Sequence, residues 1–197
     1  MENIYLIVGL GNPGREYART RHNAGFLLAE RLARRWQATW EDASKFRARV
    51  ALMKRKGQRL VMCQPQTYMN ASGEAVGLVA GFYKVPASRV MVLVDDADLP
   101  LGEIRMRSKG SSGGHHGLDS VSEHLISGDY PRLRIGLGRR ERNVRQITDY
   151  VLGRFSPDEE ALLEIILARA SDQVECWLDE GIEKAMNRFN GAVVAAP

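Results

Sequence analysis

Short apolar runs alternate with amphipathic segments from the beginning of the chain. Residues 4–8 form a β-branched run that stops at Gly9, and the apolar residues of 24–36 recur with helical spacing. Residues 46–53 alternate apolar and basic, and residues 59–64 form another short apolar segment after a turn at Lys56-Gly57-Gln58. The pattern predicts a strand, a helix and a hairpin, in that order.

The same alternation continues through the rest of the chain. We expect a helix over 71–83, which ends before Pro86, and a buried strand over 90–94 that leads into Asp95 and Asp96. Further strands are expected at 103–108 and 132–136, a flexible glycine-rich loop at 110–114, a short helix at 118–126, and one or two helices over 157–189. These elements predict a single α/β domain over 1–197, with a flexible C-terminal end.

Composition places the chain among ordinary globular proteins. It has 197 residues, of which 44% are hydrophobic and 26% charged. No apolar run is long enough to cross a membrane, and the N-terminus lacks the features of a signal peptide, so we expect a cytoplasmic protein without a membrane partner. Cys63 and Cys176 are far apart in sequence and are expected to be reduced core residues.

The charge distribution favours a polyanionic partner. The formal net charge is +4 and the pI is about 9.2. The basic residues gather in three places: Arg15, Arg19 and Arg21; Arg105, Arg107 and Lys109; and Arg139, Arg140, Arg142 and Arg145. Such clusters suit the phosphates of a nucleic acid, although solvated positive patches are also common.

His22 is the first candidate for chemistry, because it follows a glycine-rich turn at the end of a predicted strand. Ligands of open α/β sheets bind at the carboxyl ends of strands, where a histidine can accept a proton at neutral pH. Taken alone, a histidine near a loop is more often a surface or helix-capping group, so the other motifs must decide. Residues 9–14 also match the dinucleotide-binding fingerprint, which would suggest an oxidoreductase. However, Pro13 favours a turn, and Arg34 and Arg35 stand where that motif needs an acidic residue.

Asn70 and Asp95 are the next candidates. Asn70 could simply cap the helix that follows it, or its amide could hold a water and support an oxyanion beside Tyr68 and Met69. Asp95 could be a capping or solvent-facing residue like Asp96 and Asp98, or its carboxylate could fix the tautomer of a histidine base. The pair His115-His116 invites a metal interpretation, but adjacent side chains seldom bind one ion, and we expect no metal and no cofactor.

Taken together, these motifs resemble the bacterial peptidyl-tRNA hydrolase family. The matching segments run in the family's order and comprise 8–14, Tyr17, 20–25, 65–73, 95–102, 113–118 and 134–138. The resemblance implies a twisted mixed sheet between helices and a protein that acts as a monomer. It also implies hydrolysis, without a metal, of the ester bond between a peptide and tRNA.

The resemblance also implies roles for individual residues. His22 would be the general base, Asp95 would orient it, and Asn70 would place the water or the scissile carbonyl. Asn12 would bind near the scissile bond and help to distinguish blocked from free aminoacyl ends. The remaining substrate and tRNA contacts would come from Tyr17, Tyr68, Met69, Asn70, His116, Arg105 and Arg107.

Two departures from the family pattern bear on these roles. The family usually has asparagine in place of His116, and commonly has histidine in place of Val94. The change at His116 keeps an alternative open, namely an RNA-binding member of the same fold that has lost hydrolysis. The presence of His22, Asp95, Asn70 and Asn12 favours the enzyme, since a pure binder needs only basic and aromatic contacts.

Overall fold

One mixed β-sheet organises the computed structural model, which describes residues 3–138 and 144–193 and, for 144–147, the backbone alone. Its order is β2-β3-β4-β1-β5-β7-β6-β8. The strands are β1 Ile4–Gly9, β2 Glu41–Ala43, β3 Ala48–Arg55, β4 Gln58–Pro65, β5 Val90–Asp96, β6 Glu103–Arg107, β7 Arg132–Gly136 and β8 Gly191–Ala192. The central strands β4, β1, β5 and β7 are parallel, and the flanking pairs are antiparallel.

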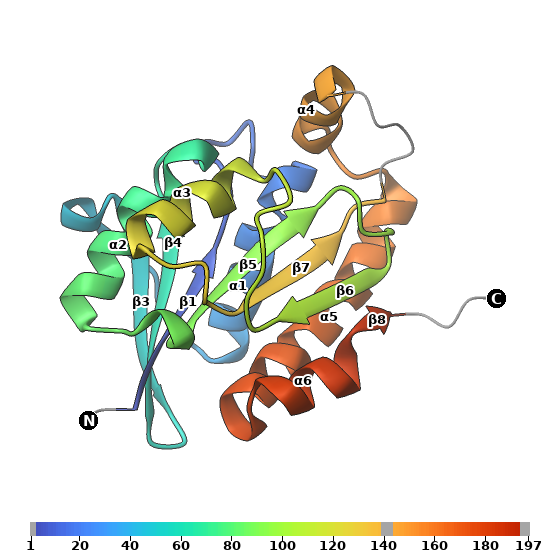
Figure 1. Ribbon diagram of the computed structural model, residues 1–197. Helices are drawn as coiled ribbons and strands as arrows, with labels where there is room; N and C mark the ends of the chain where they lie inside the picture. The colour runs from blue at the N-terminus through green and yellow to red at the C-terminus, as the bar shows by residue number, and fades with distance from the viewer. Residues whose placement is uncertain (1–2, 139–143, 194–197) are drawn as a thin grey trace.

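Helices cover both faces of this sheet (Figure 1). They are α1 Ala24–Arg35, α2 Ser72–Tyr83, α3 His116–Leu125, α4 Val144–Leu152, α5 Pro157–Glu180 and α6 Ile182–Phe189, with short 3₁₀ turns η1 Arg21–Asn23, η2 Ser44–Phe46, η3 Met69–Ala71 and η4 Ala87–Arg89. Residues of α2 and α3 share one hydrophobic cluster, and residues of α1, α5 and α6 share another. This confirms the predicted α/β fold with a mixed sheet between helices.

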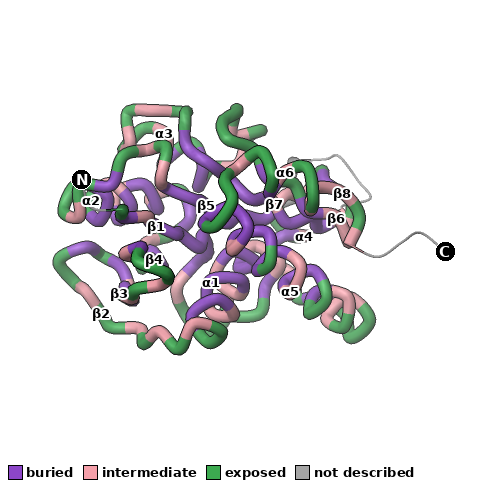
Figure 2. The backbone as a smooth tube through the Cα atoms, turned by 90° about the horizontal axis from the view of Figure 1, so that it is seen from below, coloured by how far each residue is buried: buried purple, intermediate pink, exposed green. Residues whose placement is uncertain are grey.

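Successive residues of the central strands enter the two clusters alternately. In β1, Leu6 and Val8 pack towards α2 and α3, whereas Ile7 packs towards α1 and α5. Figure 2 shows the result, with buried residues along the strands and exposed residues on the outer turns of the helices. Within the described ranges, no helix is long and apolar enough to span a membrane.

The structure confirms the strongly patterned elements and corrects weaker ones. The predicted hairpin is β3 and β4, joined at Lys56 and Gly57, which both have positive φ as its tight turn requires. Phe46 lies in η2 rather than in a strand, because left-handed Arg47 turns the chain before β3 begins. The sequence pattern did not predict β2, α4 or β8. Arg139, Arg140, Arg142 and the C-terminal end at 194–197 lie outside the described residues.

Close backbone contact fixes where α1 begins. A Cβ on Gly25 would lie 2.3 Å from Leu93 O and 2.6 Å from Leu10 O, so only glycine lets the helix approach the ends of β1 and β5. Phe26 N also donates to Leu10 O at 3.1 Å. No helix opens within the glycine motif of 9–14, contrary to the dinucleotide-binding arrangement.

Candidate active site

The site lies at the edge of the sheet where its parallel strands end. Asp95 is near the end of β5, Asn12 follows β1, and Met69 follows β4 in η3. His22 is in η1, which the contact at Gly25 holds against the ends of β1 and β5. His115 comes from the loop that precedes α3. Segments far apart in the sequence therefore meet at this edge, as open α/β sheets favour.

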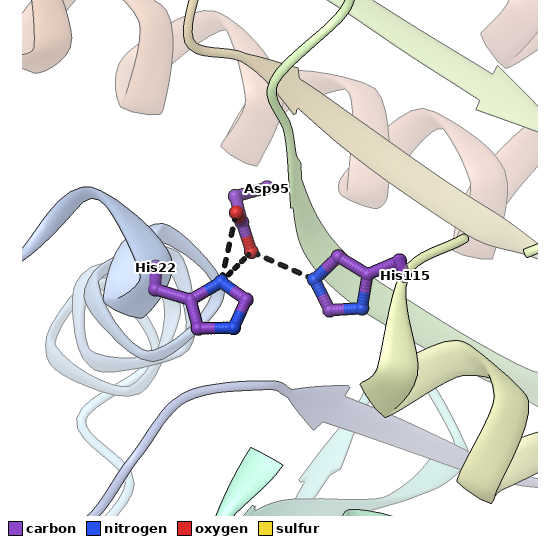
Figure 3. Close-up of side chains that lie close together, drawn as sticks. All are labelled: His22, Asp95 and His115. Atoms are coloured by element: carbon purple, nitrogen blue, oxygen red, sulfur yellow. Dashed lines mark hydrogen bonds and ion pairs between the residues drawn. The ribbon is translucent and has the colours of Figure 1, made fainter. Parts of the chain in front are cut away.

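The Asp95 carboxylate lies between two imidazole rings (Figure 3). His22 Nδ1 is 2.9 Å from Asp95 Oδ2 and 3.1 Å from Oδ1, and His115 Nε2 is 3.0 Å from Oδ1. The ring centroids are 5.1 Å apart. Asp95 is only 2% exposed, while each histidine keeps one edge partly accessible. The structure thus brings together His22 and Asp95, as the proposed general base requires.

The hydrogen bonds determine which nitrogen of each neutral ring carries a proton. Gly117 N donates to His115 Nδ1 at 3.1 Å, so Nδ1 of that ring is an acceptor and Nε2–H donates to Asp95. His22 has the opposite arrangement, because its Nδ1–H faces the carboxylate. His22 Nε2 has no protein partner among the described residues, which leaves its lone pair available to accept a proton.

Burial and charge act in opposite directions on the His22 and Asp95 pKa values. Burial lowers the pKa of His22, but attraction to Asp95 and the hydrogen bond with it raise that pKa, and the net change is upward from 6.5. Burial raises the pKa of Asp95, but the charges and hydrogen bonds of the two neighbouring histidines lower it by more, so the net change is downward. Asp95 is therefore held as a carboxylate that stabilises a protonated His22.

Asn12 and Met69 are joined on the other side of the site. Met69 N donates to Asn12 Oδ1 at 2.8 Å, and Asn23 contacts the backbone of Asn12 with both ends of its side-chain amide. Met69 is buried beside the first turn of α3, since a Cβ on Gly117 would lie 2.6 Å from its sulfur. The loop after β1, η3 and the start of α3 are thus directly connected.

The other predicted substrate residues lie in the segments that carry this centre, and none of them hydrogen-bonds to Asp95, whose partners in the described structure are His22 and His115. Asn70 is exposed in η3, next to Met69, and Tyr68 is 63% exposed. Tyr17 is half-buried in the turn between Asn12 and His22. The side chain of His116 is 83% exposed, and its ring lies 3.9 Å from Asp119 rather than beside the carboxylate of β5. The structure leaves the roles assigned to these residues as predictions.

Arg105 and Arg107 form part of an arginine-rich face of β6 and β7. Arg105 pairs with Arg134 and Arg107 with Arg132 across the antiparallel strands, so all four side chains lie on one face of the sheet. Arg132 and Arg134 bind carbonyls of the loop at 110–112, and Arg134 also pairs with Asp96. Arg105 and Arg107 are exposed and have no ion-pair partner in the part of the chain that the structure describes.

The basic cluster near the first loop differs from this face. Arg21 pairs with Glu159 at 2.7 Å and stacks on Tyr150, and Arg19 lies 3.5 Å from Glu160. These contacts attach η1 to α4 and α5. Two of its charges are thus paired with acidic side chains, and the expectation that this cluster meets a nucleic acid stays a prediction.

Sequence reasoning missed two residues of the site. His115 was noted only as half of a histidine pair, and Asn23 was not singled out. The sequence could not show which of the two histidines faces the site, because the directions of their side chains depend on where α3 begins. His115 precedes the helix and its ring turns inward, whereas His116 is the first helical residue and its ring faces solvent.

His22, Asp95 and His115 also offer a possible set of metal ligands. One ligand atom from each lies within 4.8 Å of the others. The objection that adjacent histidines seldom chelate one ion does not apply to this set, because His116 is not part of it. The expectation of a metal-independent site therefore stays a prediction, and a chelator tests it directly.

Comparisons with known proteins agree on one family. The family model described as Peptidyl-tRNA hydrolase matches residues 6–196. A peptidyl-tRNA hydrolase from Gloeobacter violaceus is 45% identical over 98% of both chains, and one from Chloroflexus aggregans is 46% identical over 95% of this chain and 99% of its own. The crystal structure of peptidyl-tRNA hydrolase from Acinetobacter baumannii matches with a TM-score of 0.91 at 35% identity, covering 98% of this chain and 97% of that one.

Proposed function

Since the chain belongs to the peptidyl-tRNA hydrolase family and hydrolyses peptidyl-tRNA, we propose that His22 is the general base that cleaves the ester bond between peptide and tRNA. The observation that supports this role is the arrangement of one imidazole, whose Nδ1 is held by Asp95 while its Nε2 meets no hydrogen-bond partner in the described parts of the chain. An ester has a better leaving group than an amide, so a single activated water suffices for its cleavage. The pair of Asp95 and His22 is suited to activate that water.

The proposed reaction has two steps. His22 Nε2 removes a proton from water as the water oxygen bonds to the ester carbonyl carbon, which forms a tetrahedral oxyanion. The bond from this carbon to the ribose oxygen then breaks, and the His22 imidazolium returns its proton to that oxygen. Asp95 stabilises the imidazolium between the two steps. Asn70, which is exposed beside the centre, positions the water and supports the oxyanion.

Asn12 provides a physical basis for selecting blocked substrates. Its Oδ1 already accepts a hydrogen bond from Met69 N, so the end of the side chain that remains for substrate is the Nδ2 donor. A peptide or acyl group on the amino acid presents a carbonyl that can accept this hydrogen bond. A free ammonium group has only donors, so an unblocked aminoacyl end cannot form the same contact.

The tRNA part of the substrate would bind beside this centre. Arg105 and Arg107 face solvent next to the loop that carries His115, and their contribution would come mainly from attraction to phosphates. Tyr17, Tyr68, Met69 and His116 would contact the acceptor end, where exposed aromatic rings can stack on an unpaired base. We assign the protein to the cytoplasm, where this substrate is released from ribosomes, and expect it to act as a monomer.

The direct test is cleavage of N-acetyl-aminoacyl-tRNA by the purified protein with a chelator present, compared with the same tRNA carrying a free amino group. We expect rapid release from the blocked substrate alone. Tight, salt-sensitive binding without cleavage would instead support the RNA-binding alternative. Activity that disappears with chelator and returns with a divalent metal would identify the two histidines and Asp95 as metal ligands and overturn the proposed role of His22.

A further inference from the structure

Asn23 holds the backbone of Asn12 at two points. Asn12 N donates to Asn23 Oδ1 at 2.8 Å, and Asn23 Nδ2 donates to Asn12 O at 2.9 Å. Asn23 is 1% exposed. The buried side-chain amide therefore pairs with both the N–H and the C=O of one residue, which fixes that residue's backbone more fully than a single hydrogen bond.

This pairing replaces the usual task of an asparagine at this position. Asn23 is the N-cap residue of α1, where an asparagine side chain normally accepts a hydrogen bond from the first helical turn. Its side chain makes no such cap hydrogen bond here. The side chain is used for the backbone of Asn12 instead of the first turn of α1.

Asn12 is in turn fixed from a second side. Its backbone is bound to Asn23, and its Oδ1 is bound to Met69 N. The Nδ2 group, which has no hydrogen-bond partner within residues 3–138 and 148–193, is then the end left for substrate, in one fixed orientation. Asn23 is also the next residue after His22, so a single turn of chain carries both the proposed base and the side chain that positions Asn12.

We propose that Asn23 is a positioning residue for substrate selection, which holds Asn12 so that its Nδ2 donor meets the acyl carbonyl of a blocked aminoacyl end. The inference rests on the proposed function. It differs from a purely structural role because it predicts a change in selectivity, rather than an equal loss of activity on all substrates.

The test uses Asn23→Asp and Asn23→Ala. The aspartate has almost the same shape and keeps an acceptor for Asn12 N, but it places a second oxygen against Asn12 O, which repels it. The alanine removes both hydrogen bonds. The measurement is kcat/KM for N-acetyl-aminoacyl-tRNA divided by kcat/KM for the same tRNA with a free amino group, together with the pH profile for the blocked substrate.

We expect both variants to lower this selectivity ratio by about tenfold, which corresponds to roughly 1.4 kcal/mol at 25 °C. The acid limb of the pH profile should stay where it is in the wild type for Asn23→Ala, which adds no charge and leaves His22 and Asp95 unchanged. For Asn23→Asp it should move to higher pH, because a new carboxylate beside His22 favours the protonated ring. The matched control is Gln58→Met, which removes another buried amide that donates to a backbone carbonyl, that of Leu178, far from the site. It should lower thermal stability without changing the ratio.

A double-mutant cycle with Asn12→Ala distinguishes a role of Asn23 in positioning Asn12 from a purely structural role. If Asn23 acts through Asn12, then Asn23→Asp should have no further effect on selectivity once the Asn12 side chain is gone. A selectivity ratio unchanged in Asn23→Asp would overturn the inference, as would an equal fall in both kcat/KM values. If the wild type cleaves neither substrate, the proposed function itself fails and this inference fails with it.

Discussion

At the scale of single residues, the two histidines around Asp95 have different uses. The Nδ1 of His115 accepts a hydrogen bond from Gly117 N and its Nε2 lies against Asp95, so both nitrogens of that ring already have partners. His22 has no such restriction, because its Nε2 faces no protein partner among the described residues. The same carboxylate therefore orients one ring as a fixed donor and leaves the other as the base.

The raised pKa of His22 leads to a prediction about pH. The base must be unprotonated, so kcat/KM should rise with pH through the pKa of His22, with a midpoint above the ordinary value of 6.5. In Asp95→Asn the two effects that raise this pKa are lost, and burial, which lowers it, remains. The acid limb should therefore move to lower pH, while the plateau rate falls by about 10²-fold or more.

Measuring the pH profiles of the wild type and Asp95→Asn between pH 5 and 9 checks this result. Asp119→Asn is a suitable control, since Asp119 is an exposed carboxylate beside His116 and lies away from His22. An acid limb that does not move in Asp95→Asn would show that His22 is not the group that titrates.

At the scale of elements, the sequence predicted the helices and strands whose hydrophobic pattern continues over many residues. The apolar runs of β1 and β5 and the amphipathic pattern of α1 were sufficient to place His22 and Asp95 near one edge of the sheet. β2 has three residues, Glu41, Asp42 and Ala43, and its position depends on pairing with β3, which leaves no pattern in the sequence. The contacts of Asn23 and the inward turn of His115 depend on tertiary packing, so no local signal identifies them.

The contact between α1 and the strands leads to a second prediction. Gly25→Ala places a Cβ against the carbonyls of Leu93 and Leu10, and backbone atoms cannot rotate away as side chains can. We expect the free energy of unfolding to fall by about 1–3 kcal/mol or more and activity to fall with it, because η1 carries His22. Thermal unfolding and the cleavage assay measure the two effects.

Gly81→Ala is the matched control for this substitution. Gly81 is in α2, and a Cβ there would meet nothing within 4 Å. Alanine is favoured over glycine inside a helix, so this variant should be more stable by about 0.4–1 kcal/mol and fully active. Equal stability of Gly25→Ala and the wild type would contradict the idea that the close contact of α1 with the ends of β1 and β5 holds His22 in place.

At the scale of the whole molecule, the exposed arginines of β6 provide positive charge beside the site, where the phosphates of tRNA would bind. If Arg105 and Arg107 contact phosphates, each alanine substitution should weaken tRNA binding and reduce the slope of log K against log salt by about one. Arg35→Ala is the control, since Arg35 is at the far end of α1 and is paired with Asp172 and Glu175. Binding titrations of tRNA at several salt concentrations give the slopes, and slopes equal to that of the wild type would exclude the two arginines from the interface.

The most direct measurement for the central claim is single-turnover cleavage of N-acetyl-aminoacyl-tRNA by His22→Ala, with tRNA affinity measured in parallel. Loss of a general base should lower the rate by about 10²- to 10⁴-fold. The affinity for tRNA should change little, because the arginine-rich face of β6 and β7 is unchanged. A His22→Ala variant that binds tRNA normally and cleaves within about threefold of the wild-type rate, far from the loss expected for a base, would contradict the account.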